Sequence, residues 1–395
     1  MGSPAMQTPD SLLTRDFVVL NAVTFLSFCN LAVFFQFYQY LGTLPIDPKW
    51  FGFIIGIFSF MVLILRPVIS PFIHAGNARN LMIAGCALVI PSLLLYNVGH
   101  ELWSMVLIRI IHGIGYVVLA TASTAALVAC IPQERSGQAF GLITVVTLLP
   151  YAVIPPLLQP LASKLGGFDQ TLDLFAGLMV LAFPMLIWGG AGRGTTHQGH
   201  GERLRWADLV EDLHNFNVCR LLVVSLIVWT AFTAVFYFVK GYGQQIGIAN
   251  PGWFFTLSTF AEISVRLVAG SYFDKLDKGR LLVGSMVWLV AGYVLLASVP
   301  AAVAFYGLGV LLGLGWGVAM PVISGLVFDI SPIKFRALNI NLTFEMFQGG
   351  FFLGPVLGGA LLLTGGYSAV FYFCGGISLL AVAAAIPLIA ARRKK

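Results

Sequence analysis

Apolar residues form runs of about twenty residues that follow one another almost without interruption along the chain. Each run is long enough to cross the ~30 Å hydrocarbon layer of a bilayer as an α-helix. The runs do not alternate apolar and polar positions with a period of two, which excludes an outer-membrane β-barrel. The pattern predicts twelve transmembrane helices, near residues 17–41, 51–73, 81–98, 102–131, 140–165, 171–190, 219–243, 252–273, 281–299, 301–328, 338–364 and 367–390.

Composition supports an integral membrane protein. Hydrophobic residues make up 58% of the chain, charged residues 10%, and the mean hydropathy is +0.91. The five cysteines are scattered through apolar runs with no CxxC spacing, so neither a disulfide framework nor a metal site is predicted. No cofactor motif is present, and we expect none to be bound.

The long polar stretch AGRGTTHQGHGERLRWADLVEDLHNF divides the chain into two halves. We expect a six-helix bundle at residues 1–190, a linker at 191–218 and a second six-helix bundle at 219–395. Leu204, Trp206, Leu209, Val210 and Leu213 recur at helical spacing within the linker, which predicts a short amphipathic helix at the membrane surface.

Basic residues fix the expected orientation. Only Lys49 and Lys164 fall on one side of the twelve-helix arrangement. The other side holds Arg15, Arg79, Arg135, Arg193, Arg203, Arg205, Arg220, Lys275, Lys278, Arg280, Lys334, Arg336, Arg392, Arg393, Lys394 and Lys395. The positive-inside rule therefore places both termini and the linker in the cytoplasm. The net charge of +6 is then mainly a topology signal, and nucleic-acid binding is not predicted.

The two halves share an internal repeat with an offset of 200 residues. Arg66 corresponds to Arg266, and the stretch Gly113-Ile-Gly-Tyr corresponds to Gly313-Leu-Gly-Trp. Pro132 and Pro155 likewise correspond to Pro332 and Pro355. Duplicated halves are typical of secondary transporters that bind a substrate near the midplane between the repeats.

Three short motifs resemble those of the major facilitator superfamily. Gly270, Asp274 and the pair Gly279-Arg280 are similar to the loop signature of that family, and Arg109 with His112-Gly113 is similar to its intramembrane arginine motif. The stretch 350–359 looks like the glycine-proline motif of the antiporters, although that motif belongs in the fifth helix, where this chain has other residues.

The resemblance implies an all-α polytopic fold of two pseudo-symmetric six-helix bundles. It also implies a monomeric secondary transporter of a small molecule, similar to the drug-efflux and sugar-efflux branch of bacteria, in the inner (plasma) membrane. The resemblance also implies roles for the loop residues. Asp274 and Arg280 would help to stabilise one conformation, and Gly270 would allow two helices to approach closely.

Charged residues inside the predicted helices are costly in lipid and therefore mark candidate sites. Arg109 could hold an anionic group, with His112 one turn deeper. Glu262 and Arg266 are four residues apart and therefore share one helix face. Glu262 could be a proton carrier with Arg266 as its partner, or the two residues could form a static ion pair. The resemblance implies that the second and eleventh helices touch across the halves. Arg66 and Glu345 lie on these helices at matching depths, and we expect a bridge between them that breaks when the cavity opens inward. Glu345 is then a rival proton site.

Polar residues near the midplane are expected to line the pathway, although buried amides also connect helices. These residues are Asn30, Gln36, Thr230, Trp316, Asn341 and Gln348. Lys240 lies near the outer end of its helix, and we expect its ammonium group to reach the membrane interface.

The sequence favours proton-coupled efflux of a small organic molecule by antiport. Proton-coupled uptake of a small organic anion is the alternative, because basic residues outnumber acidic ones inside the helices and the fifth-helix antiporter motif is missing. A receptor or scaffold that transports nothing is a third possibility. No GxxxxGK[ST], HExxH or GxSxG motif is present, so an ATPase or an intramembrane enzyme is not predicted.

Overall fold

The computed structural model describes residues 13–131, 135–188, 215–273, 276–298 and 302–392, and the regular elements in these ranges are all helices. The helices are α1 (Arg15–Ala32), η1 (Val33–Gln36), α2 (Phe37–Leu41), η2 (Pro48–Trp50), α3 (Phe51–Ile69), η3 (Ser70–Phe72), α4 (Ala75–Leu94), η4 (Leu95–Asn97), α5 (Leu102–Ala129), α6 (Ser136–Leu165), α7 (Phe168–Val180), α8 (Ala182–Trp188), α10 (Phe216–Gln245), α11 (Trp253–Phe273), α12 (Lys278–Leu296), α13 (Ala302–Ile330), η6 (Ile333–Phe335) and α14 (Arg336–Arg392).

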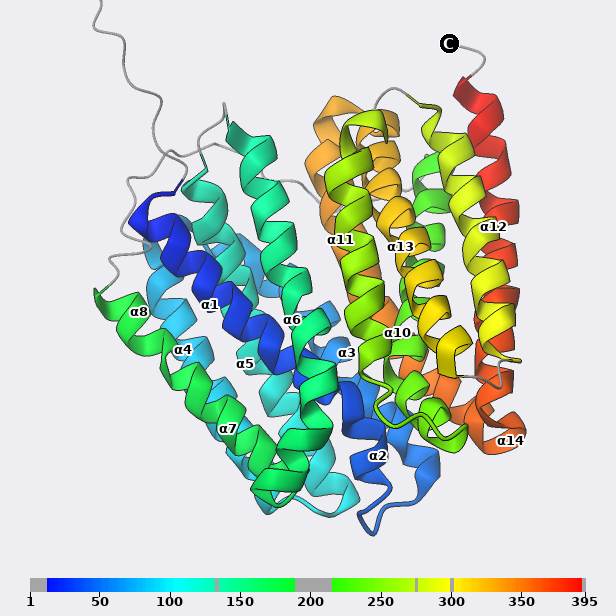
Figure 1. Cartoon of the computed structure of the whole chain (residues 1–395). Helices are drawn as coiled ribbons and strands as arrows, with labels where there is room; N and C mark the ends of the chain where they lie inside the picture. Colours follow the sequence, from blue (N-terminus) through cyan, green and yellow to red (C-terminus); the bar gives the residue numbers. More distant parts are fainter. Residues whose placement is uncertain (1–12, 132–134, 189–214, 274–275, 299–301, 393–395) are drawn as a thin grey trace, which may run out of the picture.

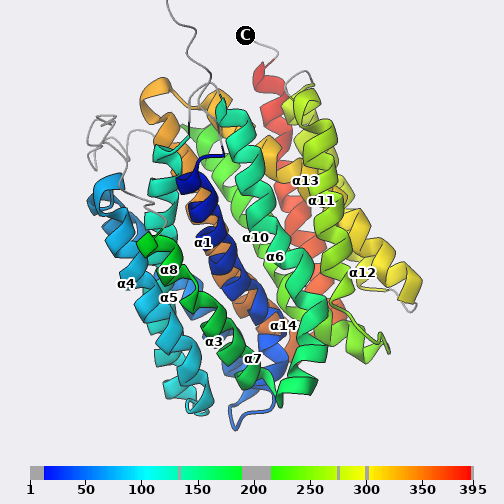
Figure 2. The same ribbon diagram turned by 60° about the vertical axis from the view of Figure 1, so that its left-hand side comes forward.

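The helices form two groups that stand side by side (Figure 1). In the first group, α4 and α3 pack against α5, and α1 packs against α6. In the second group, α10 and α12 pack against α14, and α11 packs against α13. The groups meet where α3 contacts α14 and where α6 contacts α11 (Figure 2). We call the end of the bundle where α1 begins and α14 ends the terminal face, and the opposite end the distal face.

The helix boundaries fit twelve membrane crossings. Within the described ranges, ten segments are long and apolar enough to span a bilayer. One of them, Leu338–Ile389, contains 52 residues and is interrupted at Gly366, where φ is 71° and the chain reverses between two helical parts. The 21-residue helix α11 supplies a further crossing. The predicted amphipathic linker helix falls within residues 189–214, which lie outside the described part of the chain.

The internal repeat is visible in the helix packing. A Cβ atom on Gly113 of α5 would lie 2.9 Å from the carbonyl oxygen of Phe58 in α3. At the position 200 residues later, a Cβ atom on Gly313 of α13 would lie 2.6 Å from Cα of Ser258 in α11. Each half therefore brings its second and fourth long helices into backbone contact at the same pair of positions, and glycine is required for the approach.

Close contact between α3 and α14 joins the two groups. A Cβ atom on Gly52 would lie 2.9 Å from Cα of Val356 and 3.0 Å from the carbonyl carbon of Pro355. One turn further along α3, a Cβ atom on Gly56 would lie 2.9 Å from the carbonyl oxygen of Phe352. These are backbone contacts, which cannot give way by a simple rotamer change, so the glycines set the distance between the groups.

We predict that Gly52→Ala lowers the thermal midpoint of the purified protein, because the added methyl group forces α3 away from α14 at a cost of about 1–3 kcal/mol. The matched control is Gly177→Ala in α7, where nothing lies within 4 Å of the added atom. The control should unfold at the wild-type temperature or slightly above it, since alanine favours helices. Equal midpoints for the two variants would contradict the assignment of Gly52 as a spacing residue.

Candidate functional site

A cavity of about 280 Å³ lies between the two groups, in the half of the molecule near the terminal face. Helix α6 forms one wall, and α11, α12 and α13 form the other. The lining residues are Gly141, Thr144, Val145, Ile263, Arg266, Leu267, Lys278, Pro321, Val322 and Gly325. The walls are mostly apolar with a small number of polar groups, which is typical of sites that bind small organic molecules.

Glu262 and Arg266 are ion-paired on α11 beside this cavity, as their spacing predicts. Glu262 is 4% exposed, and Arg266 reaches into the cavity wall with its Nε atom buried and without a hydrogen-bond partner. Gly317 of α13 lies directly against the backbone of Glu262. The pair therefore combines a buried acid with a cation that has unused hydrogen-bonding capacity at the cavity.

Arg66 of α3 and Glu345 of α14 face each other across the two groups. The Arg66 Nε atom lies 3.9 Å from the Glu345 Oε1 atom, which is a loose ion pair, while the Glu345 Oε2 atom is buried without a hydrogen-bond partner. The guanidinium of Arg66 also lies 5.7 Å from the ring centroid of Phe344. The structure thus brings the two predicted residues together. A water molecule between them, or a proton on Glu345, could change the distance between the two side chains.

Aromatic rings close the space between this cavity and the distal face. Phe35 of η1 packs edge-on against Phe236 of α10 and Phe255 of α11, with both ring centroids at 5.5 Å. Tyr151 of α6 contacts Phe236 at the same distance. Edge-to-face pairs add about 0.5–1.5 kcal/mol each to the burial of the rings. We call Phe35, Tyr151, Phe236 and Phe255 the aromatic seal.

Polar contacts join the groups beyond the aromatic seal. Thr256 of α11 donates a hydrogen bond to the carbonyl oxygen of Ala152 in α6 at 2.6 Å. The Nζ atom of Lys240 donates to Oε1 of Gln36 at 2.6 Å. The expectation that Lys240 reaches the membrane interface is therefore wrong. Lys240 is only 7% exposed, and its ammonium group is bound by Gln36, the last residue of the 3₁₀ turn η1.

Arg109 lies in the core of the first group and not at the cavity wall. It donates through Nη2 and Nε to the carbonyl oxygens of Ile55 and Ile54 in α3, at 2.8 and 3.2 Å. The guanidinium carbon lies 4.7–5.0 Å from the ring centroids of Phe34, Phe37 and Phe58. Cation–π contacts and carbonyl oxygens together solvate this charge in place of water.

His112 and Asn30 bind each other close to Arg109. The Asn30 amide nitrogen lies 2.9 Å from Nε2 of His112, and both residues are fully buried. The Tyr96 hydroxyl lies 3.5 Å from Nδ1 of His112 and 3.5 Å from Nη1 of Arg109. The Oδ1 atom of Asn30 has no partner in the described part of the chain. In this conformation the network stabilises the first group from within.

The other predicted pathway residues are not among those that line the cavity. Thr230 is buried and donates to the carbonyl oxygen of Leu226, and Gln348 is also buried. Trp316 is fully buried, donates to the Tyr293 hydroxyl at 2.9 Å, and lies 4.7 Å from the ring of Phe232. Asn341, by contrast, is exposed on α14.

Of the predicted gating residues at the terminal face, Gly270 belongs to the last turn of α11 and Asp274 lies outside the described residues. The backbone N–H of Arg280 donates to Asp277 at 3.0 Å, and its guanidinium Nε lies 4.0 Å from the same carboxylate. Asp277 thereby caps the N-terminus of α12.

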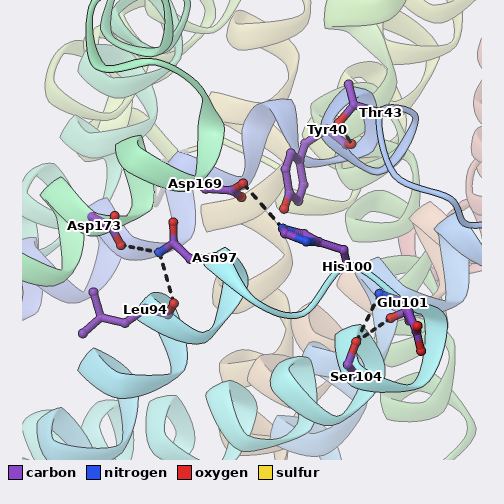
Figure 3. A network of polar contacts seen from close by, with 9 residues as sticks. All are labelled: Tyr40, Thr43, Leu94, Asn97, His100, Glu101, Ser104, Asp169 and Asp173. Atoms are coloured by element: carbon purple, nitrogen blue, oxygen red, sulfur yellow. Dashed lines mark hydrogen bonds and ion pairs between the residues drawn. The ribbon is translucent and has the colours of Figure 1, made fainter.

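A separate polar network lies at the distal end of the first group (Figure 3). Asn97 donates to Asp173 of α7 at 2.7 Å, and Nε2 of His100 lies 3.9 Å from Asp169. Tyr40 of α2 stands beside Asp169 in this network (Figure 3). These contacts tie the connection between α4 and α5 to α7, and they are remote from the cavity.

Sequence reasoning missed the residues of α10 that face the first group. Tyr237 is 5% exposed and lies close to Arg109 of the first group. Lys240 follows one turn later. Because α10 is apolar on nearly every face, periodicity could not identify the side that meets the first group. A lysine inside an apolar helix was the available signal.

Comparison with known proteins gives a consistent result. The family model of the Major Facilitator Superfamily matches residues 20–252 and 221–395. The staphylopine export protein of Staphylococcus aureus is 22% identical over 349 residues, covering 82% of this chain and 83% of that protein. The quinolone resistance protein NorA of the same species is 27% identical over 151 residues, or 38% of each chain.

Solved structures with the same fold include the nucleoside transporter NupG, with a TM-score of 0.75, 14% identity, and 94% and 98% of the two chains covered. A bacterial homologue of the human lysosomal transporter Spinster, in an inward-facing and unoccupied conformation, has a TM-score of 0.80, 10% identity and coverage of 97% and 98%. The helical architecture, the repeat and the family match together show that this multi-pass membrane protein belongs to the Major Facilitator Superfamily of transporters.

Proposed function

We propose that this protein exports a small organic molecule in exchange for protons by alternating access. The observation that carries the proposal is the placement of the Glu262–Arg266 pair beside a cavity between the two helix groups, with the aromatic seal between that cavity and the distal face. Similarity to a staphylopine export protein and to a quinolone resistance protein supports the outward direction.

The terminal face is assigned to the cytoplasm, because nearly all basic residues of the short loops and of the chain ends belong to that side. We therefore place the protein in the inner membrane of a bacterium with both termini inside the cell. The cavity then accepts substrate from the cytoplasm. Residues 1–190 and 219–395 would rock as two units joined by 191–218, and one chain contains the whole pathway, so a monomer suffices.

Glu262 is the residue we assign to proton transfer. As a carboxylate it attracts Arg266, and a proton on either oxygen abolishes that charge attraction. Arg266 is then free to move within the cavity wall, where its Nε atom already lacks a partner. Substrate binding beside Arg266 and proton binding to Glu262 would thereby be coupled through a shared cation, and antiport requires that the two binding events exclude one another.

Glu345 is a second candidate for the same role. Its Oε2 atom is buried and unpartnered, and its tie to Arg66 at 3.9 Å spans the two groups. A proton at Glu345 would release the contact between α3 and α14 near the terminal face. Protonation would have a different effect at each of the two residues. At Glu262 it would change the cavity wall, and at Glu345 it would weaken the contact between the two helix groups.

Uptake of a small anion with protons is the second candidate function. It is favoured by Arg109 and Lys240, neither of which has a carboxylate partner among the described residues. Movement of substrate against an imposed proton gradient in reconstituted vesicles supports export, and movement together with the protons supports uptake. A receptor or scaffold would move nothing under either gradient.

We predict that a cysteine introduced at Val145, in the cavity wall, reacts with a maleimide added from the cytoplasmic side of inverted membrane vesicles, in a variant whose five native cysteines are replaced. A cysteine at Phe255, in the aromatic seal, should react at least tenfold more slowly from that side, because ring packing excludes the reagent. Equal labelling of both positions would show that the seal does not close the pathway.

We predict that Glu262→Gln abolishes accumulation driven by a pH gradient while exchange of labelled ligand at equal pH continues, because glutamine cannot carry the proton. The ligand would be the compound with the largest thermal shift in a panel of organic anions and cationic dyes. Glu101→Gln, at the exposed start of α5, is the matched control and should behave as wild type.

The same assay on Glu345→Gln separates the two acids. Loss of coupling in Glu345→Gln alone would transfer the proton site to Glu345. Retention of gradient-driven accumulation in both variants would refute coupling through either residue.

A further inference from the structure

The distal half of α10 presents two polar side chains to the first group. Tyr237 and Lys240 are three residues apart and therefore lie on one helix face. Lys240 donates to Gln36 of η1, and Tyr237 contacts Arg109 of α5. Both side chains are at least nine-tenths buried, and the hydrogen bond from Lys240 to Gln36 joins the two helix groups on the distal side of the cavity.

This region contains two positive charges without a negative partner in the described part of the chain. Arg109 is solvated by carbonyl oxygens and aromatic rings, and Lys240 by a carboxamide oxygen. The buried Glu262 and the partly buried Glu345 are each paired with their own arginine. Burying a charge without a counter-charge is costly, so two such cations, Arg109 in the core of the first group and Lys240 between the groups, call for a compensating function.

Both cations flank the point where the first transmembrane helix is interrupted. The 3₁₀ turn η1 separates α1 from α2, and Gln36 has a non-helical backbone with φ −99° and ψ 10°. Lys240 binds the side chain of Gln36, and the Arg109 guanidinium lies against the rings of Phe34 and Phe37. Interrupted helices at a repeat interface are where secondary transporters place their binding groups.

We propose that Lys240 and Tyr237, with Arg109 behind Tyr237, bind the negatively charged group of the substrate, and that the substrate is an organic anion. In the conformation described here, the Gln36 carboxamide oxygen occupies the acceptor position on the Lys240 ammonium group. When the groups separate at the distal face, the substrate's oxyanion replaces it. Tyr237 donates a hydrogen bond from its hydroxyl group to the same anion, and the positive charge of the nearby Arg109 strengthens the attraction.

The proposal deepens the proposed function, and rests on it only for the statement that the bound anion is also transported. It makes Lys240 a specificity-determining residue, because a neutral analogue of the anion would leave the ammonium group unpaired. A hydrogen bond to a charged group contributes more than a neutral one, and this difference sets the preference between the two ligands.

The test uses two probes of equal shape and different charge, 2-naphthoate and 2-naphthamide, whose affinities for the full-length protein in detergent are measured by equilibrium binding. We expect wild type to bind the carboxylate at least tenfold more tightly than the amide. Lys240→Met should reduce this preference about tenfold, and Lys240→Arg should retain most of it. Tyr237→Phe should reduce it severalfold, since one donor is lost.

The matched control is Lys49→Met. Lys49 is exposed in the distal connection before α3 and is paired with Asp47 at 2.7 Å, so its replacement should leave the preference unchanged. The thermal midpoint of each variant is measured alongside, and Lys240→Arg supplies a folded comparison if Lys240→Met is unstable.

Equal affinity of wild type for both probes, or binding of neither, overturns the proposal. So does a Lys240→Met variant that retains the wild-type preference, which would leave Lys240 as a contact of the closed distal face alone. A preference that depends on Lys240 in a protein that moves no naphthoate across vesicles under any gradient would support the anion site and refute the transport function.

Discussion

A charged side chain at lipid depth must have a partner or water, and this constraint organises the interior of the protein. Glu262 and Arg266 satisfy it within one helix, and Arg66 and Glu345 satisfy it across the two helix groups. Arg109 satisfies it with backbone carbonyl oxygens and three phenylalanine rings. Each of these three sets of contacts holds a different pair of surfaces together, because none of the charges can be buried in the hydrocarbon layer without a partner.

Glycine contacts provide the rigid frame in which these charges are held. Gly113 and Gly313 let the second and fourth long helices of each half meet backbone to backbone, and Gly52 and Gly56 do the same between the halves. Interfaces packed this closely are expected to move as units, since a small shift would cause atomic overlap. Rocking of two groups about the contact between α3 and α14 is therefore easier than deformation of either group.

Two kinds of contact hold the helix groups together in the distal half, the apolar ring contacts of the aromatic seal and the polar contact between Lys240 and Gln36. The aromatic seal excludes water without directional bonds, so it can open without leaving polar groups unsatisfied. The contact between Lys240 and Gln36 is directional and involves a charge, so its loss must be compensated by water or by a ligand. Selectivity would then come from the polar contact, and the barrier to leakage from the aromatic rings.

The sequence by itself determined that the elements are transmembrane helices and which pairs of residues lie on one helix. Runs of about twenty apolar residues specify transmembrane helices, because unpaired backbone groups are not tolerated in lipid. The spacing of four between Glu262 and Arg266 is enough to predict their contact. The offset of 200 residues likewise predicted that the halves repeat each other, as the paired contacts of Gly113 and Gly313 show.

Only the tertiary structure decided which buried polar groups meet between helices. Asn30 binds His112, and Lys240, which was expected at the membrane interface, binds Gln36. The physical reason is that α5 and α10 are apolar on most faces, so sequence periodicity does not reveal which side faces lipid, a neighbouring helix or the cavity. Helix rotation and the 3₁₀ turn at η1 are set by packing between residues far apart in the chain, and those contacts assign each polar side chain its partner.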